Sequence, residues 1–168
     1  AEFLENLDMV SEVKSFDKFN TPRVSQLSQR SNQFNLRTVR YSEGDIEKIS
    51  NDKNYQNFSF TLSDKYGDNG LISIVILEKK TTDTLFINTW LMSCRVLKRG
   101  MENFILNTLV NYSQKNGFKK IIGEYIETEK NKLVENHYQD LGFLILESEK
   151  KNLFQLEIKD YTYKKCYI

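Results

Sequence analysis

Hydrophobic and polar positions follow two different periods along this 168-residue chain, and each period predicts a type of element. Short apolar and alternating segments are typical of strands. They occur at residues 35–41 (NLRTVRY), 57–64 (NFSFTLSD), 71–80 (LISIVILEKK), 84–92 (TLFINTWLM), 119–126 (KKIIGEYI), 143–147 (FLILE) and 153–158 (LFQLEI). The second and third segments are expected to pair as an antiparallel hairpin through Asp68-Asn69-Gly70, because an Asn-Gly step favours a tight turn.

Apolar residues three or four apart predict helices in the remaining segments. One helix is expected within residues 3–19, and a second from Pro22 to about Phe34, because proline is suited to a first helical turn. Ser42 and Asp45 form a capping-box pattern that starts a helix at residues 43–52. A further helix follows Gly100, and another ends at Gly142.

This order of elements predicts an α+β fold with a mixed, mostly antiparallel sheet of about seven strands flanked by helices. We expect residues 35–168 to form one domain. Residues 1–34 are interpreted as a helical lead-in or linker from an upstream domain. A chain of this length is sufficient to bury a hydrophobic core without disulfide bonds.

Charge and composition narrow the class of protein. The formal net charge of +1 gives no general electrostatic reason to bind nucleic acid or a membrane surface. The longest apolar run, residues 71–77, is far shorter than the ~20 residues of a membrane-spanning helix, and residues 1–8 do not resemble a secretory signal. A cytoplasmic location is therefore expected. Cys94 and Cys166 lack metal-ligand spacing, so we expect two free thiols and no metal site.

The basic turn after residue 92 is a candidate anion site. Arg95, Lys98 and Arg99 lie within five residues, and Gly100 would let backbone approach a ligand at a helix start. Cations and backbone N–H groups together suit a pyrophosphate or the phosphate of phosphopantetheine. The alternative is a solvated basic turn, and Glu102 in the first helical turn would repel an anion.

Three side chains are candidates for chemistry, each with a structural alternative. Tyr138 could act as a general acid, or it could be a core tyrosine. Cys94 lies between a strand and three cations, a setting that favours a nucleophilic thiolate, but a buried packing cysteine is the commoner case. His137 is the only histidine and lies on an apolar helix face, which favours a structural role. Asp64 and Asp68 are expected to shape a turn.

Several of these segments resemble the GNAT type of N-acetyltransferase domain. Residues 36–50 resemble its first strand and helix, and residues 84–126 resemble its CoA-binding strand, pyrophosphate loop, helix and splayed strand. Asn131, Tyr138 and Leu141-Gly142-Phe143 match its fourth helix. The resemblance covers residues 35–158 and implies that Tyr138 is the general acid. It further implies a CoA site formed by Arg95, Val96, Leu97, Lys98, Arg99, Gly100, Met101 and Asn131.

Four segments together resemble the C-terminal domain of FkbH-like proteins: residues 23–41, 62–76, 89–106 and 123–143. That resemblance implies an upstream HAD-type domain and an acyl carrier protein as partners. It also implies that a glyceryl group from 1,3-bisphosphoglycerate is loaded on the carrier for methoxymalonyl-type polyketide extender units, with the phosphate chemistry in the HAD domain.

Three functions follow from these resemblances. The leading expectation is a GNAT-like domain that contributes thioester or phosphopantetheine recognition to such an FkbH-like acyltransferase. A second is a free-standing acyl-CoA-dependent N-acyltransferase that uses Tyr138. The third is a non-catalytic scaffold that docks a carrier protein, which Leu97 and Glu102 favour over the second because they depart from the loop pattern of the GNAT family.

Overall fold

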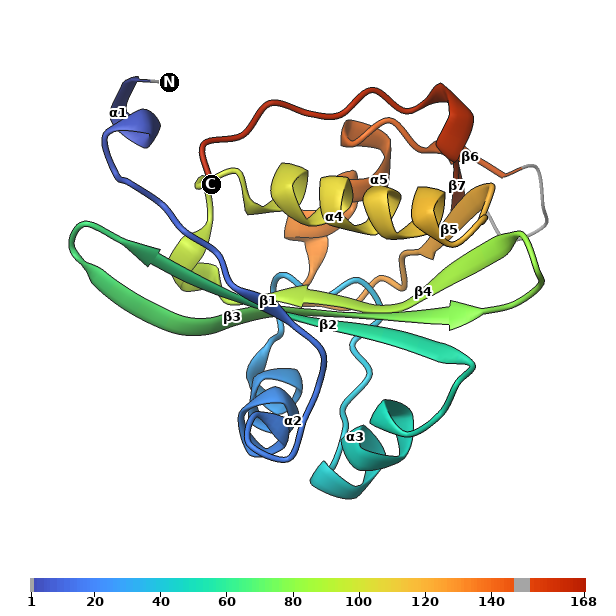
Figure 1. Ribbon diagram of the computed structural model, residues 1–168, viewed down its shortest axis with the longest axis horizontal. Coiled ribbons are helices and arrows are strands. Elements are labelled where there is room, and N and C mark those ends of the chain that lie inside the picture. Colours follow the sequence, from blue (N-terminus) through green and yellow to red (C-terminus); the bar gives the residue numbers. More distant parts are fainter. Residues whose placement is uncertain (1, 147–151) are drawn as a thin grey trace.

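The computed structural model describes residues 2–146 and 152–168 (Figure 1). Within these residues, seven strands form one sheet in the order β1-β2-β3-β4-β5-β7-β6. Only β4 and β5 run parallel among the neighbouring strands described; the other pairs are antiparallel, as predicted. The strands are β1 (Val13–Lys14), β2 (Tyr55–Asp64), β3 (Gly67–Lys79), β4 (Thr84–Met92), β5 (Lys120–Glu124), β6 (Leu144–Ile145) and β7 (Leu153–Glu157).

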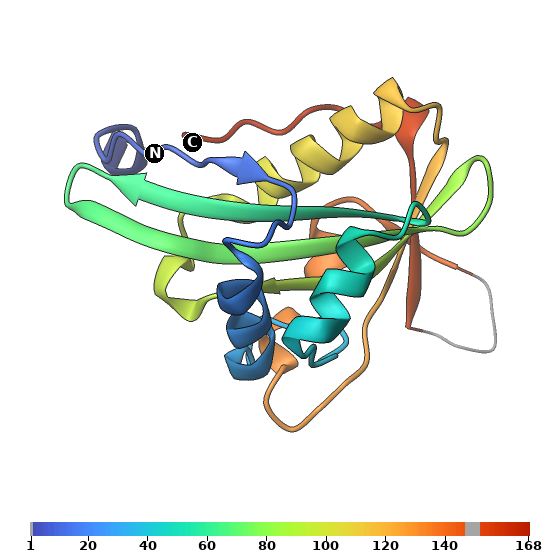
Figure 2. The same ribbon diagram turned by 60° about the horizontal axis from the view of Figure 1, so that its bottom comes forward.

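Helices cover both faces of the sheet (Figures 1 and 2). On one face lie α2 (Thr21–Arg30) and α3 (Glu43–Ser50), and on the other lie α4 (Met101–Lys115) and the short α5 (His137–Asp140). The shorter pieces are α1 (Glu2–Glu5) and the 3-10 turns η1 (Cys94–Val96), η2 (Lys132–Val134) and η3 (Ile158–Asp160). In the part of the chain described, no helix is long and apolar enough to span a membrane. The predicted α+β architecture is confirmed.

Two hydrophobic clusters hold these layers together. The larger one packs α4 and α5 against one face of the sheet and includes Trp90, Ile105 and Tyr138. The smaller one packs α2 and α3 against the other face and includes Val24 and Ile46. Because side chains alternate across a strand, β3 supplies residues to both clusters.

Local signals placed the helix starts correctly. Pro22 lies in the first turn of α2, which ends at Arg30, earlier than predicted. Asp45 N donates to Ser42 Oγ over 3.1 Å, and Ser42 N donates to Asp45 Oδ2 over 2.9 Å, so the predicted capping box of α3 is confirmed. The helix predicted before Gly142 is instead divided into η2 and α5, and Gly142 ends it with a φ of 98°.

The prediction of a helix within residues 3–19 was wrong. Only α1 is helical there, and Asp8 has a φ of 53°, which breaks the helical path. Beyond it, Val10 forms a bridge with Ser63, and β1 pairs with β2. Apolar side chains at helical spacing can also occur in an edge strand. Here Val10, Val13 and Lys14 pair with the edge of β2 and do not continue the helix. The division of the chain at residues 34 and 35 stays a prediction.

The strand predicted at residues 35–41 was also wrong, apart from one bridge between Asn35 and Leu91. Thr38 has a φ of 56°, and its N–H donates to Asn35 Oδ1 over 2.9 Å, so the chain turns there. The β2–β3 hairpin is confirmed, but its turn is Lys65-Tyr66, since Asp64 pairs with Gly67. Asp64 accepts from Tyr66 N as predicted for a turn-shaping residue. Asp68 likewise accepts from Gly70 N.

Candidate functional site

The three cations of the basic turn diverge. Arg99 donates to Asp64 Oδ2 over 2.9 Å, and Arg95 donates to the carbonyl of Asn69 over 3.2 Å. Lys98 instead lines a small cavity of about 380 Å³ together with Glu102 and Asp140. The three cations thus have different neighbours, and the phosphate site expected at the start of α4 stays a prediction.

The start of α4 is unfavourable for an anion. Gly100 caps the helix with a φ of 84°, and Glu102 lies in the first turn. Burial raises the pKa of Glu102, so the environment already disfavours its charge and would disfavour that of a second anion. Val96 and Met101, both predicted cofactor-binding residues, are fully buried in the larger hydrophobic cluster. Leu97 packs against the same cluster, and a cofactor-binding role for these residues stays a prediction.

Tyr138 lies inside the core. Its side chain is 1% exposed, and its ring packs beside Trp90, Phe143 and Phe154. The hydroxyl is buried and makes no hydrogen bond within the described residues, and burial raises the pKa of the phenol. A general acid must reach the atom that it protonates. The packing favours the interpretation of Tyr138 as a core residue.

His137 is buried next to Tyr138 and stacks edge-on against Trp90, with 4.3 Å between the ring centroids. Burial lowers the pKa of His137 to about 3. The imidazole is therefore neutral at physiological pH, and its surroundings agree with the structural role expected for it.

The gap between β4 and β5 is occupied by the chain itself. These strands pair only from Thr84–Ile87 to Lys120–Gly123. Beyond that, residues 34–36 lie between them: Leu36 N donates to Trp90 O over 3.2 Å, Met92 N donates to Phe34 O over 3.0 Å, and Ile126 N donates to Leu36 O over 2.8 Å. We call residues 34–36 the inserted segment.

Asn131 fastens the inserted segment to the loop after β5. Its Nδ2 donates to the carbonyls of Asn35 over 3.0 Å and Ile126 over 2.9 Å. Its Oδ1 accepts from Thr128 N over 2.8 Å and from the hydroxyl of Tyr125 over 3.2 Å. Because the amide is fully buried and every polar atom of it has a partner, its contacts are those of a structural residue.

These contacts test whether the residues fit CoA between β4 and β5. An extended ligand arm would need the backbone groups that the inserted segment already uses. Withdrawing the segment would also expose two core side chains, Phe34 and Leu36, at about 1.5–3 kcal/mol each, a large part of a typical stability of ~5–15 kcal/mol. The described residues therefore do not fit CoA in this gap.

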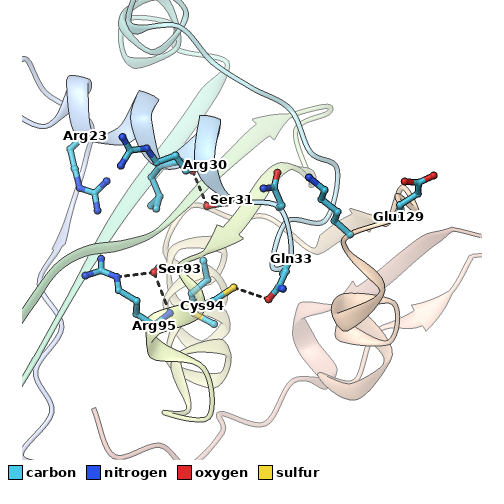
Figure 3. A pocket seen from close by; sticks show the side chains of 12 residues that line it. Arg23, Arg30, Ser31, Gln33, Ser93, Cys94, Arg95 and Glu129 are labelled. Atoms are coloured by element: carbon cyan, nitrogen blue, oxygen red, sulfur yellow. Dashed lines mark hydrogen bonds between the residues drawn. The ribbon is translucent and has the colours of Figure 1, made fainter.

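A larger pocket of about 910 Å³ opens beside α2, which lies on the face of the sheet opposite to α4 (Figures 1 and 3). It is polar, with four cationic side chains against one carboxylate. Three separate parts of the chain form its walls. The lining residues are Arg23, Leu27, Arg30, Ser31, Asn32, Gln33, Met92, Ser93, Cys94, Arg95, Glu129 and Lys130. We call this cavity the cationic pocket.

The charges of the cationic pocket are not neutralised by neighbours. Burial lowers the pKa of Arg23, and so do the nearby charges of Arg95 and Arg30. Figure 3 shows the guanidinium groups of Arg23 and Arg95 pointing toward each other. Among the described residues, the ion pairs within 4.0 Å all lie elsewhere, so no pocket cation has a carboxylate partner. An anionic ligand would relieve this like-charge repulsion.

Cys94 is an exposed free thiol at the wall of this pocket. Its Sγ donates to Gln33 Oε1 over 3.2 Å, which joins η1 to the segment after α2. Ser93 Oγ accepts from Arg95 N over 3.3 Å and from Arg95 Nε over 3.2 Å. These two bonds hold the guanidinium of Arg95 close to η1, the turn that contains Cys94. The arrangement can bind an anion and offer a nucleophile beside it.

Sequence reasoning identified Cys94 and Arg95 but not the other cations of the pocket. Arg23 and Arg30 are seven residues apart and therefore share a face of α2, which was a usable signal. Nothing in the sequence showed that this face meets η1. In the described part of the chain, no group of three or more His, Cys, Asp or Glu side chains is placed to hold a metal ion.

Solved structures with the same fold include N-acetyltransferases. The ribosomal-protein-S18-alanine N-acetyltransferase of Escherichia coli matches with a TM-score of 0.64 at 16% identity, over 89% of this chain and 94% of that one. A GNAT-family protein of Desulfovibrio desulfuricans gives 0.67 at 11% identity, over 89% and 99%. The spermidine N-acetyltransferase of Vibrio cholerae, in complex with CoA and spermine, gives 0.62 at 12% identity, over 89% and 96%.

At these identities the likeness shows the fold, which is the GNAT acetyltransferase fold. No protein-family model and no curated protein matches the sequence.

Proposed function

We propose that this chain is the carrier-facing domain of an FkbH-like acyltransferase, in which Cys94 passes a glyceryl-type acyl group to the phosphopantetheine thiol of an acyl carrier protein. One observation carries the proposal. All residues that line the cationic pocket lie within three of the four segments that resemble FkbH-like proteins, residues 23–41, 89–106 and 123–143. The resemblance and the cavity thus converge on the same residues.

The proposed transfer is a thioester exchange. The carrier thiolate attacks the carbonyl carbon of an acyl group on Cys94 Sγ. The new C–S bond forms as the bond to Sγ breaks, and Cys94 leaves as a thiolate that takes up the proton lost by the carrier thiol. The unpaired cations of the pocket would stabilise both thiolates and the developing oxyanion. An upstream domain would supply the acyl group.

A second candidate is an acyl-CoA-dependent N-acyltransferase. The fold favours it, because the solved structures that share the fold include enzymes named as N-acetyltransferases, and none of those named above concerns a carrier protein. The site does not favour it, because the inserted segment occupies the gap between β4 and β5 and Tyr138 is buried.

The test uses a carrier protein whose phosphopantetheine thiol is activated as a mixed disulfide with thiopyridine. Attack by Cys94 forms a Cys94–phosphopantetheine disulfide and releases thiopyridone, which is followed by absorbance, and intact mass identifies the product. We expect Cys166→Ser to react like the unmodified chain and Cys94→Ser not to react. The carrier should react at least about tenfold faster than activated pantetheine, because docking raises the effective concentration of the thiol.

Equal rates with the carrier and with pantetheine, or a product on Cys166 alone, would contradict the proposal. A parallel reaction with acetyl-CoA and a polyamine tests the second candidate, since N-acetylation would release free CoA. A carrier that binds without any transfer or disulfide exchange would identify the chain as a docking scaffold.

A further inference from the structure

We infer that the inserted segment replaces an extended cofactor arm between β4 and β5 and, in the same position, holds the walls of the cationic pocket together. The role of the pocket rests on the proposed function, whereas the replacement and the positioning do not. Asn35 and Asn131 are then positioning residues for Cys94.

The insertion is bonded on both sides of the gap. Leu36 and Phe34 share hydrogen bonds with Trp90 and Met92 on β4, and Leu36 O accepts from Ile126 N on the opposite side. Phe34, Asn35 and Leu36 are 5%, 1% and 0% exposed, as in the middle of a sheet. The backbone of residues 34–36 is thus buried and hydrogen-bonded on both sides, like that of a central strand, although the segment is too short to count as one.

Each wall of the cationic pocket directly adjoins this insertion. One wall, residues 30–33, immediately precedes it in the chain. The second wall, residues 92–95, begins at the β4 residue that pairs with Phe34. The third, Glu129 and Lys130, comes just before Asn131, whose amide binds the carbonyl of Asn35. The hydrogen bonds that close the gap therefore also set the spacing of the pocket walls.

Asn35 strengthens this connection through its side chain. Its Nδ2 donates to the carbonyl of Ser31 in the pocket wall over 3.1 Å, and its Oδ1 accepts from Thr38 N in the turn that follows. Across the pocket, the bond from Cys94 Sγ to Gln33 Oε1 joins the first two walls. A ligand arm must then reach Cys94 from the α2 side, not between the splayed strands.

Amide hydrogen exchange on the unmodified chain tests the replacement. We expect the amides of Leu36, Met92 and Ile126 to exchange as slowly as those of central strands and to be unaffected by millimolar CoA. Exchange at the rate of exposed loops would overturn the inference. So would a change of about tenfold or more at these amides when CoA is added.

Thiol reactivity tests the positioning. In a Cys166→Ser background, Cys94 is reacted with a dianionic aromatic disulfide and with a neutral one of similar size. The cationic pocket should favour the dianionic reagent by about tenfold or more, and Asn131→Ala should bring that ratio toward one. Asn136→Ala is the matched control, because Asn136 is exposed and its side chain does not cap α5.

General destabilisation would raise both rates together and leave their ratio unchanged. An unchanged ratio in a folded Asn131→Ala protein would therefore overturn the positioning claim. Asn35→Ser removes the hydrogen bond from Asn35 Nδ2 to the carbonyl of Ser31, and it provides the same readout should Asn131→Ala fail to fold. None of these measurements needs a carrier protein, so failure of the proposed function would be distinguishable.

Discussion

Gly123→Ala tests whether Tyr138 is packed as the structure shows. A Cβ added at Gly123 would lie 2.4 Å from Cζ of Tyr138 and 2.6 Å from each Cε, well inside ordinary contact. The ring cannot retreat easily, because Trp90, Phe143 and Phe154 surround it. The backbone at Gly123 lies outside the positive-φ region, so the substitution itself carries no conformational penalty.

Whether Gly123→Ala lowers or raises the stability therefore shows whether the ring of Tyr138 packs on Gly123. Overpacking of a core costs about 1–3 kcal/mol, whereas alanine in place of a glycine without strain gains ~0.4–1 kcal/mol. For a chain of this size, each kcal/mol corresponds to about 2–4 °C, so an overpacking cost of about 1–3 kcal/mol should lower Tm by roughly 2–12 °C. Gly44→Ala is the matched control, because its Cβ would meet Ser42 Oγ at an ordinary 3.7 Å.

Urea unfolding of the single and double variants provides the assay. Removing the ring with Tyr138→Leu should relieve the clash, so the double variant should be more stable than the sum of the single effects by at least about 1 kcal/mol. If Gly123→Ala left stability unchanged or raised it, this packing would be refuted, and Tyr138 would again be a candidate for an accessible general acid.

Three further substitutions test buried polar groups by urea unfolding. Tyr138→Phe should not lower stability, because the hydroxyl has no partner among the described residues and an unpaired buried group costs ~1–3 kcal/mol; a loss above about 1 kcal/mol would show a hydrogen bond. The folded-state pKa of His137, about 3, is depressed below 6.5, so its contribution to stability is present above 6.5 and lost as pH falls toward 3. His137→Gln should remove this slope, up to about 1.4 kcal/mol per pH unit, and parallel curves for the two proteins would contradict it. The raised folded-state pKa of Glu102 gives stability that is present below 4.5 and lost as pH rises through that pKa, so Glu102→Gln should be the more stable protein at neutral pH but not below 4.5.

Contiguous and locally signalled elements were predictable from the sequence. The β4, η1, α4 and β5 order follows directly from changes of period along residues 84–126, and the capping box of Ser42 and Asp45 lies within four residues. Residues 3–19 and 35–41 were misassigned because their structure depends on distant partners. Val10 meets Ser63, and Asn35 meets Leu91.

The candidate site likewise contains residues that local sequence identified and residues that only distant contacts bring together. Cys94 and Arg95 were found because they adjoin other cations in the sequence. Arg23, Arg30 and Lys130 were not, because only the pairing of the inserted segment with β4 and the loop after β5 brings them beside Cys94. Lys98 and Arg99 were grouped with Arg95 by proximity in sequence, but Arg99 pairs with Asp64, and Lys98 lines the separate small cavity that Glu102 also lines.

The most direct test of the central claim is an NMR titration of the isotope-labelled chain with phosphopantetheine-bearing acyl carrier protein. We expect the largest chemical-shift changes in the cationic pocket, at Arg23, Arg30 and residues 93–95, while the amide signals of Leu36 and Met92 keep their positions. Changes centred instead on residues 98–103 and Asn131, with loss of the inserted segment's signals, would mean that the ligand enters between β4 and β5 and would contradict the account.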